Sequence, residues 1–174
     1  GMEFSILIDS LSTNLTSFFR EEQHFRFMEN RFLPELIERK EKQRSFKIRA
    51  WSAGCSSGEE PYTIAIVLNE TLKNHGRWDV KILATDISIS MLNIAKKGIY
   101  TEERVAPVPS LQKQKYLIPH NHKGQRCYEA SQVLREMIIF SYLNLMEDWP
   151  IKAGLDFIFC RNVMIYFDKP TQAV

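Results

Sequence analysis

The stretch Ala53-Gly54-Cys55-Ser56-Ser57-Gly58-Glu59-Glu60-Pro61 joins two elements of different kinds and indicates how the chain is organised. The apolar run before it, residues 45–53, ends in small side chains and predicts a buried strand. Acidic residues and proline are typical of a first helical turn, so residues 59–61 predict the start of a helix. Glycine at positions 54 and 58 lets the backbone turn tightly and approach a ligand. The pattern indicates either a simple strand-to-helix turn or a ligand-binding loop.

The same order of elements recurs along the chain. Residues 80–85 predict a second buried strand, and a helix follows near residues 90–97 and ends at Gly98. Two further apolar strands are expected over residues 137–143 and 155–160. Helices between apolar strands indicate a parallel sheet with right-handed crossovers, covered by helices on both faces. The sequence therefore predicts an α/β fold with about four parallel strands.

Two regions depart from this order. Residues 17–43 have apolar side chains at helical spacing, and Pro34 is expected to break that stretch into two helices or to kink it. Residues 101–135 contain several prolines and interrupt the alternation of strand and helix. Within them, the runs 115–118 and 125–130 could form a small hairpin.

Composition narrows the class of protein. The chain has 174 residues, of which 44% are hydrophobic, enough for one domain with a core. Its 23 basic and 21 acidic side chains nearly balance, which argues against a nucleic-acid partner. The three cysteines lie far apart, so we expect no disulfide framework or metal site and favour the cytoplasm. We also find neither an apolar run of about 18 residues nor a signal peptide, and expect no membrane insertion.

The acidic start of the predicted helix limits the kind of ligand. Glu59 and Glu60 would repel a pyrophosphate, and no Gly-Lys-Ser/Thr follows as in a P-loop. A ligand that carries an ammonium and a sulfonium group would instead be attracted. The simpler alternative is that both acids only favour the helix dipole, worth about 0.3–1 kcal/mol each. Asp86, at the end of the second strand, is placed to bind a ribose diol, or else it or Ser88 caps the next helix.

Polar pairs follow the other two predicted strands. Asn144-Leu145 comes after the third strand and Arg161-Asn162 after the fourth, so both face the crevice at the carboxyl edge of the sheet. An asparagine amide both donates and accepts hydrogen bonds, as the edge of an adenine requires. An isolated asparagine is nevertheless more often a turn former.

Taken together, these segments resemble the CheR family of chemotaxis receptor methyltransferases over residues 11–170. The resemblance rests on residues 13–21 (TNLTSFFRE), 51–62 (WSAGCSSGEEPY), 84–88 (ATDIS), 97–100 (KGIY) and 159–168 (FCRNVMIYFD). It implies a Rossmann-like class I methyltransferase sheet, incomplete here, with flanking helices and a small antiparallel insertion. It also implies methyl transfer from S-adenosylmethionine to glutamate side chains of chemotaxis receptors, with S-adenosylhomocysteine as product.

The resemblance further implies a set of cofactor contacts. Asp86 would bind the ribose, Glu59 and Arg20 would lie near the methionine part, and Asn144 would lie near the adenine. Gly54 belongs to the same site through the turn. The full set expected to bind the cofactor is Asn14, Thr16, Arg20, Gly54, Glu59, Asp86, Asn144, Leu145, Arg161 and Asn162.

The receptor glutamate is already ionised at neutral pH, since its pKa in a peptide is about 4.3. It needs placement rather than a general base. Arg20 can hold a carboxylate bidentately and the Tyr166 hydroxyl can add a hydrogen bond, so we expect this pair to be catalytic. The alternatives are that Arg20 caps a helix end and that Tyr166 is a half-buried aromatic residue.

The expected organisation follows from the same resemblance. Residues 2–44 would be the remnant of an N-terminal helical region with the cofactor-binding segment, and residues 45–174 the methyltransferase domain. Residues 115–142 resemble a β-subdomain that docks on a receptor tail. Because the family's usual chain is longer at both ends, we expect this chain to be truncated. Its fourth strand would then leave an open apolar sheet edge, and we expect the chain to self-associate through that edge.

Two alternatives remain open at this point. One is a fragment that binds S-adenosylmethionine, S-adenosylhomocysteine or a receptor without turnover. The other is a nicotinamide-dependent oxidoreductase, which Glu59 and Glu60 at the phosphate position disfavour.

Overall fold

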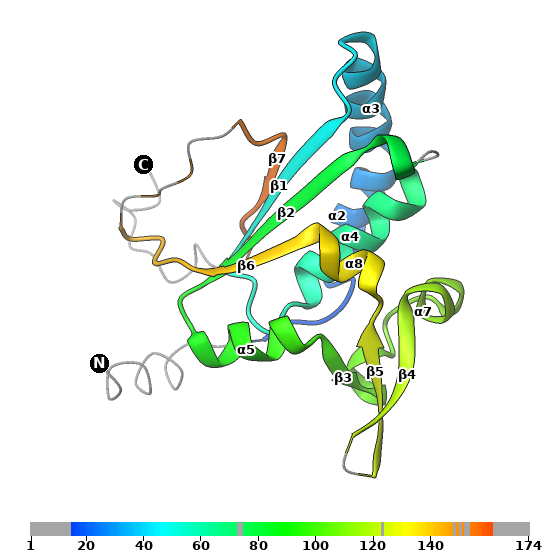
Figure 1. The fold of residues 1–174 in the computed structure, drawn as a ribbon, viewed down its shortest axis with the longest axis vertical. Coiled ribbons are helices and arrows are strands. Elements are labelled where there is room, and N and C mark those ends of the chain that lie inside the picture. Colours follow the sequence, from blue (N-terminus) through cyan, green and yellow to red (C-terminus); the bar gives the residue numbers. More distant parts are fainter. Residues whose placement is uncertain are drawn as a thin grey trace.

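The computed structural model describes residues 15–72, 75–122, 124–147, 149, 151 and 154–161. Its central feature is a four-stranded sheet in the order β6-β2-β1-β7, and every neighbouring pair is parallel (Figure 1). The strands are β1 Lys47–Ala53, β2 Asp79–Asp86, β6 Ile138–Tyr142 and β7 Phe157–Phe159. The predicted α/β fold with a parallel sheet is therefore confirmed.

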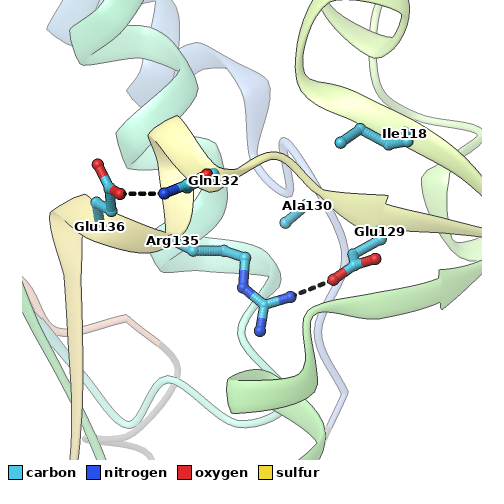
Figure 2. Close-up of a pocket in the computed structure, with 6 residues that line it drawn as sticks. All are labelled: Ile118, Glu129, Ala130, Gln132, Arg135 and Glu136. Carbon is cyan, nitrogen blue, oxygen red and sulfur yellow. Dashed lines mark hydrogen bonds and ion pairs between the residues drawn. The ribbon is translucent and has the colours of Figure 1, made fainter.

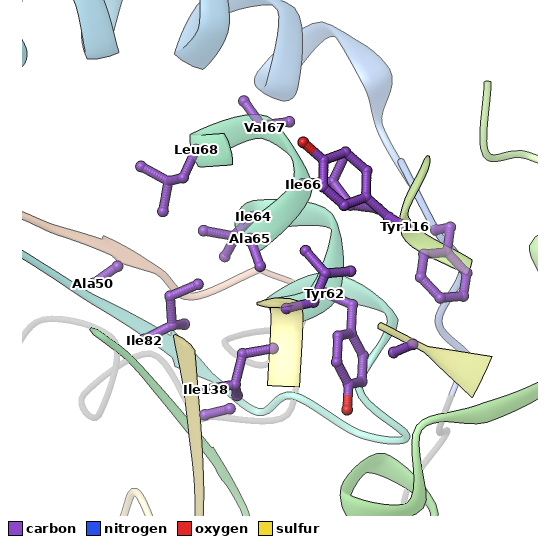
Figure 3. Close-up of a cluster of buried hydrophobic side chains, with 14 of the residues drawn as sticks. Ala50, Tyr62, Ile64, Ala65, Ile66, Val67, Leu68, Ile82, Tyr116 and Ile138 are labelled. Atoms are coloured by element: carbon purple, nitrogen blue, oxygen red, sulfur yellow. The ribbon is translucent and has the colours of Figure 1, made fainter. Parts of the chain in front are cut away.

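Helix α4, Glu59–Thr71, packs against one face of this sheet, and α2 and α3 lie beyond it (Figure 1). Nearly every side chain from Pro61 to Asn69 is buried, so α4 is enclosed on all sides. Figure 3 shows its residues facing Ala50, Ile82 and Ile138 of the sheet. Those three residues form one row, because Ala50 pairs with Ile82 and Ile82 pairs with Ile138.

The opposite face of the sheet carries a second apolar row. Ile139, Leu83, Trp51 and Ile158 are aligned by the same strand register. Trp51 is 2% exposed, whereas Ile139 and Ile158 are 54% and 50% exposed. We call these four residues the outer row. The strands are thus less evenly buried than their continuous apolar sequences suggest.

The first helical region divides into two α-helices next to Pro34, as expected, and a π-helical turn joins them. Helix α2, Glu22–Phe27, passes into a π-helical turn, Met28–Phe32, and then into α3, Leu33–Lys42. Pro34 falls in the first turn of α3, where a missing backbone N–H is tolerated best. The wider π-helical turn directly before it supplies the change of hydrogen-bonding pattern that proline requires.

A small antiparallel sheet of order β3-β5-β4 is inserted between β2 and β6, as expected. The pairing β4–β5 forms the predicted hairpin, although β4 starts two residues beyond Lys115 because α7 continues to Tyr116. The expected limits of the β-subdomain, residues 115–142, are wrong at both ends. The small sheet also includes β3, which lies before residue 115, and β6, which lies within those limits, belongs to the large sheet. The elements of this region are α5 Ile89–Lys97, β3 Ile99–Thr101, α6 Glu102–Val105, α7 Ser110–Tyr116, β4 Leu117–His122, β5 Gln125–Ala130 and α8 Gln132–Met137.

Among the residues that the structure describes, no helix has both the length and the hydropathy needed to cross a bilayer. Over the same residues, no group of histidine, cysteine, aspartate and glutamate side chains could hold a metal ion.

Candidate cofactor site

The carboxyl ends of the four parallel strands lie at one edge of the large sheet, where open α/β sheets bind ligands. The loop after β1 is joined to the end of β2, because the Cys55 amide donates to the Thr85 carbonyl at 2.8 Å. The segment after β6 is joined to the same end, because the Leu143 amide donates to the Asp86 carbonyl at 3.1 Å. The structure therefore brings the predicted loops together.

The loop after β1 depends on left-handed backbone conformations. Gly54, Ser56 and Gly58 have φ angles of 70°, 47° and 98°. A Cβ added at Gly58 would lie 2.8 Å from the Tyr100 hydroxyl and 2.9 Å from the Ala95 Cβ. Gly58 is thus required by both its conformation and the close packing of the insertion against the loop.

Asp86 is 8% exposed and holds two backbone amides at this edge. One carboxylate oxygen accepts from the Ser56 amide at 2.7 Å, and the other accepts from the Ser88 amide at 2.9 Å. The cap of α5 is Ser88 itself, whose hydroxyl accepts from the Met91 amide at 3.2 Å. Asp86 therefore fixes the loop after β1 and precedes the capping residue.

Glu59 is fully buried at the start of α4. Its carboxylate forms an ion pair with Arg104 and accepts from the Ser57 hydroxyl at 2.8 Å. Arg104 lies 45 residues away, in the irregular insertion, and is not among the site residues expected from the sequence. No motif in the sequence marks it.

Glu60 points elsewhere than Glu59. It accepts from the Ser52 hydroxyl at 2.7 Å and from the Arg161 Nε at 2.9 Å. Burial raises the pKa of Glu60 above its ordinary value, and the Arg161 charge and the Ser52 hydrogen bond offset part of that rise. The two acids at the start of α4 therefore have separate basic partners.

Arg161 connects the end of β7 to the segment before α2. Its Nη1 donates to the Arg20 carbonyl at 2.7 Å and lies 3.2 Å from a Glu21 carboxylate oxygen. Its guanidinium also stacks over Phe25 and Phe159, at 5.0 and 5.3 Å from the ring centroids. Arg161 thus holds residues 15–21 against the carboxyl edge of the sheet.

Within that segment, Thr16 and Arg20 are both half-buried. The Arg20 guanidinium donates to the Leu15 carbonyl, and its backbone precedes the first turn of α2. The arginine is therefore not at the carboxyl end of a helix, where a cation would cap it.

Asn144 forms a local turn after β6. Its side-chain oxygen accepts from the Met146 amide at 3.0 Å, and its side-chain nitrogen donates to Glu147 at 3.0 Å. The Leu145 carbonyl accepts from the Trp149 indole N–H at 3.1 Å. These local hydrogen bonds are the ones expected if Asn144 is a turn former. The contact between Asn144 and the adenine stays a prediction. Asn14, Asn162 and Tyr166 lie outside the described residues.

Cys55, in the middle of the loop, is a buried free thiol. Burial raises the pKa of its thiol well above the ordinary value, and the nearby carboxylate of Asp86 raises it further. The thiol is neutral at physiological pH and packs as a small apolar group.

A hollow of about 430 Å³ lies apart from this edge, between α8 and the small sheet (Figure 2). Arg135 lies beside it, paired with Glu129 at 2.5 Å. Since α8 leads into the amino end of β6, the hollow does not belong to the site at the strand carboxyl ends.

Comparisons with known proteins agree with this geometry. The family model described as "CheR methyltransferase, SAM binding domain" matches residues 14–174. A chemotaxis protein methyltransferase of Borreliella burgdorferi is 51% identical over 95% of this chain and 58% of its own length. Chemotaxis protein methyltransferase 2 of Pseudomonas aeruginosa is 42% identical, over 98% of this chain and 59% of its own length. The chemotaxis protein methyltransferase of Escherichia coli is 40% identical, over 98% and 56%.

The chain thus spans less than two thirds of the length of these relatives. The family match covers far more than half of the chain, and it includes every described segment of the carboxyl edge. The chain belongs to the CheR methyltransferase family and corresponds to its SAM-binding domain.

Proposed function

We propose that this chain is the cofactor-binding part of an enzyme that methylates glutamate side chains of methyl-accepting chemotaxis receptors, the reaction of sensory adaptation. The relatives named chemotaxis protein methyltransferase support this proposal. The observation that carries it is the edge where the glycine loop, the buried Glu59 and Asp86 meet, since the left-handed loop lets a ligand approach the backbone beside two carboxylates.

The loop has the properties that S-adenosylmethionine requires. The hydroxyl of Ser56 is buried and has no hydrogen-bond partner among the described residues. A buried hydroxyl without a partner is costly, so a polar ligand beside the loop would stabilise it. The loop therefore fits a ligand with polar groups, such as those of S-adenosylmethionine.

In this proposal Asp86 binds the ribose, Asn144 and Leu145 border the adenine, and Glu59 lies near the methionine part. Gly54 lets the backbone approach, and the remaining contacts come from Asn14, Thr16, Arg20, Arg161 and Asn162. When bound, S-adenosylmethionine supplies a methyl group on a positively charged sulfur; its transfer to a carboxylate oxygen breaks the C–S bond, leaves the electron pair on sulfur and forms a methyl ester.

The protein supplies placement for this reaction. Arg20 and Tyr166 are proposed to hold the carboxylate of the receptor glutamate, and the ionised acceptor needs no base. The segment 15–21 is held at the site by Arg161, which is consistent with a positioning role for Arg20. The expected domain limits, 2–44 and 45–174, belong to the same proposal, as do docking of a receptor tail on the small sheet β3-β5-β4 and action in the cytoplasm.

Self-association is a further part of the proposal. Within the described part of the sheet, β6 and β7 are the edge strands. Ile139 and Ile158 on these strands are half exposed. An apolar strand at a sheet edge favours pairing with another chain.

The deciding experiment is a calorimetric titration of the chain with S-adenosylhomocysteine and, separately, with NAD. We expect binding of the first and none of the second. Asp86→Asn should weaken binding by about tenfold or more, because it removes the charge from hydrogen bonds to the ribose. Asp79→Asn is the matched control, since Asp79 lies at the opposite end of β2 and pairs with Arg49 on the surface.

A chain that binds NAD, or that binds no S-adenosylhomocysteine, contradicts the proposed function. Equal affinity of Asp86→Asn and the unchanged chain contradicts the ribose assignment alone. A methyl-transfer assay with receptor-containing membranes then separates an enzyme from a domain that binds the cofactor without turnover.

A further inference from the structure

The ion pair between Glu59 and Arg104 lies beside the glycine loop. The Glu59 side chain is 1% exposed, and the Arg104 side chain, from helix α6, is 36% exposed. A carboxylate removed from water is unfavourable unless it is paired. Arg104 is the only ionic partner of Glu59 among the described residues.

Stability alone does not account for this pair. Apolar residues of similar volume often stabilise a protein as well as a buried ion pair does. An acid that only favours the helix dipole can remain at the surface of the first turn, as exposed helix-terminal acids do. Glu59 instead points inward, where one carboxylate oxygen pairs with Arg104 and the other accepts a hydrogen bond from Ser57.

The direction of the Glu59 carboxylate is fixed by a connected group. Arg104 also donates to the Ser57 hydroxyl at 2.5 Å and lies over the Tyr100 ring at 5.3 Å from its centroid. Tyr100 in turn donates its hydroxyl to the Ser57 carbonyl at 2.7 Å. The small insertion that carries Tyr100 and Arg104 therefore holds both the loop and the buried carboxylate in one orientation.

We infer that Arg104 is a positioning residue, which acts through Glu59 on the amino-acid end of the cofactor. The inference rests on the proposed function. A carboxylate can accept about four hydrogen bonds, and Arg104 and Ser57 supply two of them. The carboxylate then offers its remaining acceptor positions to an ammonium group in a set direction. The Glu59–Arg104 pair has no net charge, and neither has the zwitterionic amino-acid end of S-adenosylhomocysteine, so each group of one can face the opposite charge of the other.

The test compares two ligands on the same chain. S-adenosylhomocysteine carries the amino-acid end, and 5′-methylthioadenosine has the same nucleoside and thioether without it. Arg104→Met should weaken binding of S-adenosylhomocysteine by about tenfold or more and change that of methylthioadenosine by less than about twofold. Arg104→Lys keeps the charge but not the guanidinium whose Nη2 contacts both Ser57 and Glu59, and it should give an intermediate loss.

Two further variants serve as controls, one for loss of folding in Arg104→Met and one for a nonspecific effect of removing a positive charge. The double variant Glu59→Gln with Arg104→Met leaves no unpaired charge, so it should unfold at a higher temperature than Arg104→Met and show the same loss of ligand discrimination. Arg31→Met removes an arginine whose side chain is 73% exposed on the first helical region, and should bind both ligands as the unchanged chain does.

The outcomes are distinct. Unaltered affinity of Arg104→Met for S-adenosylhomocysteine overturns the inference, as does an equal loss for both ligands, which would indicate collapse of the loop. Equal affinity of the unchanged chain for both ligands also overturns it but leaves cofactor binding intact. Binding of neither ligand by the unchanged chain rejects the proposed function itself.

Discussion

At the scale of single residues, Gly58 shows why the loop cannot tolerate an ordinary side chain. Its φ of 98° is a left-handed conformation. The space where a Cβ would lie is taken by the Tyr100 hydroxyl and by Ala95, at 2.8 and 2.9 Å. Ala95 belongs to α5 and Tyr100 to β3, so two later elements close over this glycine. A single methyl group here opposes both the backbone and the packing.

Gly58→Ala should therefore reduce the free energy of unfolding by about 2–4 kcal/mol, from left-handed strain and overpacking together. Urea unfolding followed by circular dichroism measures the change. Gly76→Ala is the control, because a Cβ at Gly76 meets nothing within 4 Å, and should stay within about 0.5 kcal/mol of the unchanged chain. Similar costs for the two substitutions would show that the close approach at Gly58 is not limiting.

The candidate site could be predicted from the sequence only in part. The loop and Asp86 follow directly from strand ends, because a parallel sheet places those ends at one edge. The partner of Glu59 could not be predicted, since Arg104 reaches it through the folding of the insertion and not through any local pattern. For Asn144 the sequence left a turn and a ligand contact open, and the structure shows the turn.

At the scale of elements, one arginine joins three parts of the chain. Arg161 follows β7, contacts Glu60 at the start of α4 and binds the Arg20 carbonyl before α2. The sequence predicted these elements but not their connection, because a side chain of that length can turn toward several neighbours. The division of the first helical region next to Pro34 was predicted, but the π-helical turn Met28–Phe32 that joins its two helices was not.

Arg161→Leu should loosen the segment before α2 while the sheet remains intact. Amide hydrogen exchange over residues 17–25 should become about tenfold faster, as expected when a local opening is made easier by about 1.4 kcal/mol. Exchange in β1 and β2 should not change. Arg26→Leu, which removes an exposed pair with Glu22, serves as the control. Unaltered exchange in Arg161→Leu would assign the anchoring of this segment to its apolar contacts instead.

At the scale of the whole molecule, the two faces of the large sheet differ. Helix α4 covers the row that contains Ala50 and Ile82, whereas Ile139 and Ile158 of the outer row remain half exposed. The sequence predicted the strands correctly, but continuous apolar runs do not reveal which face is covered. Coverage depends on which segments pack against the sheet, and a pattern within one strand contains no information about them.

The proposed self-association can be tested at this scale by light scattering over a range of protein concentrations. The mean mass should rise with concentration, and Ile158→Lys should reduce that rise by placing a charge on the edge strand. Leu111→Lys is the control, since Leu111 is 81% exposed on α7 in the insertion. A constant monomeric mass at every concentration would reject the proposal.

The indole rings near the carboxyl edge give this chain an optical property of its own. Trp149 lies edge-on to Trp51 at 5.0 Å and donates its N–H to the Leu145 carbonyl. Trp51 is buried and donates to the Thr85 hydroxyl, while Trp149 is 52% exposed. A rearrangement of the turn at Asn144 and Leu145 thus changes the surroundings of the Trp149 indole, whereas the Trp51 indole beside it stays buried in the sheet. The intrinsic fluorescence of the chain can report events at this turn without an attached dye.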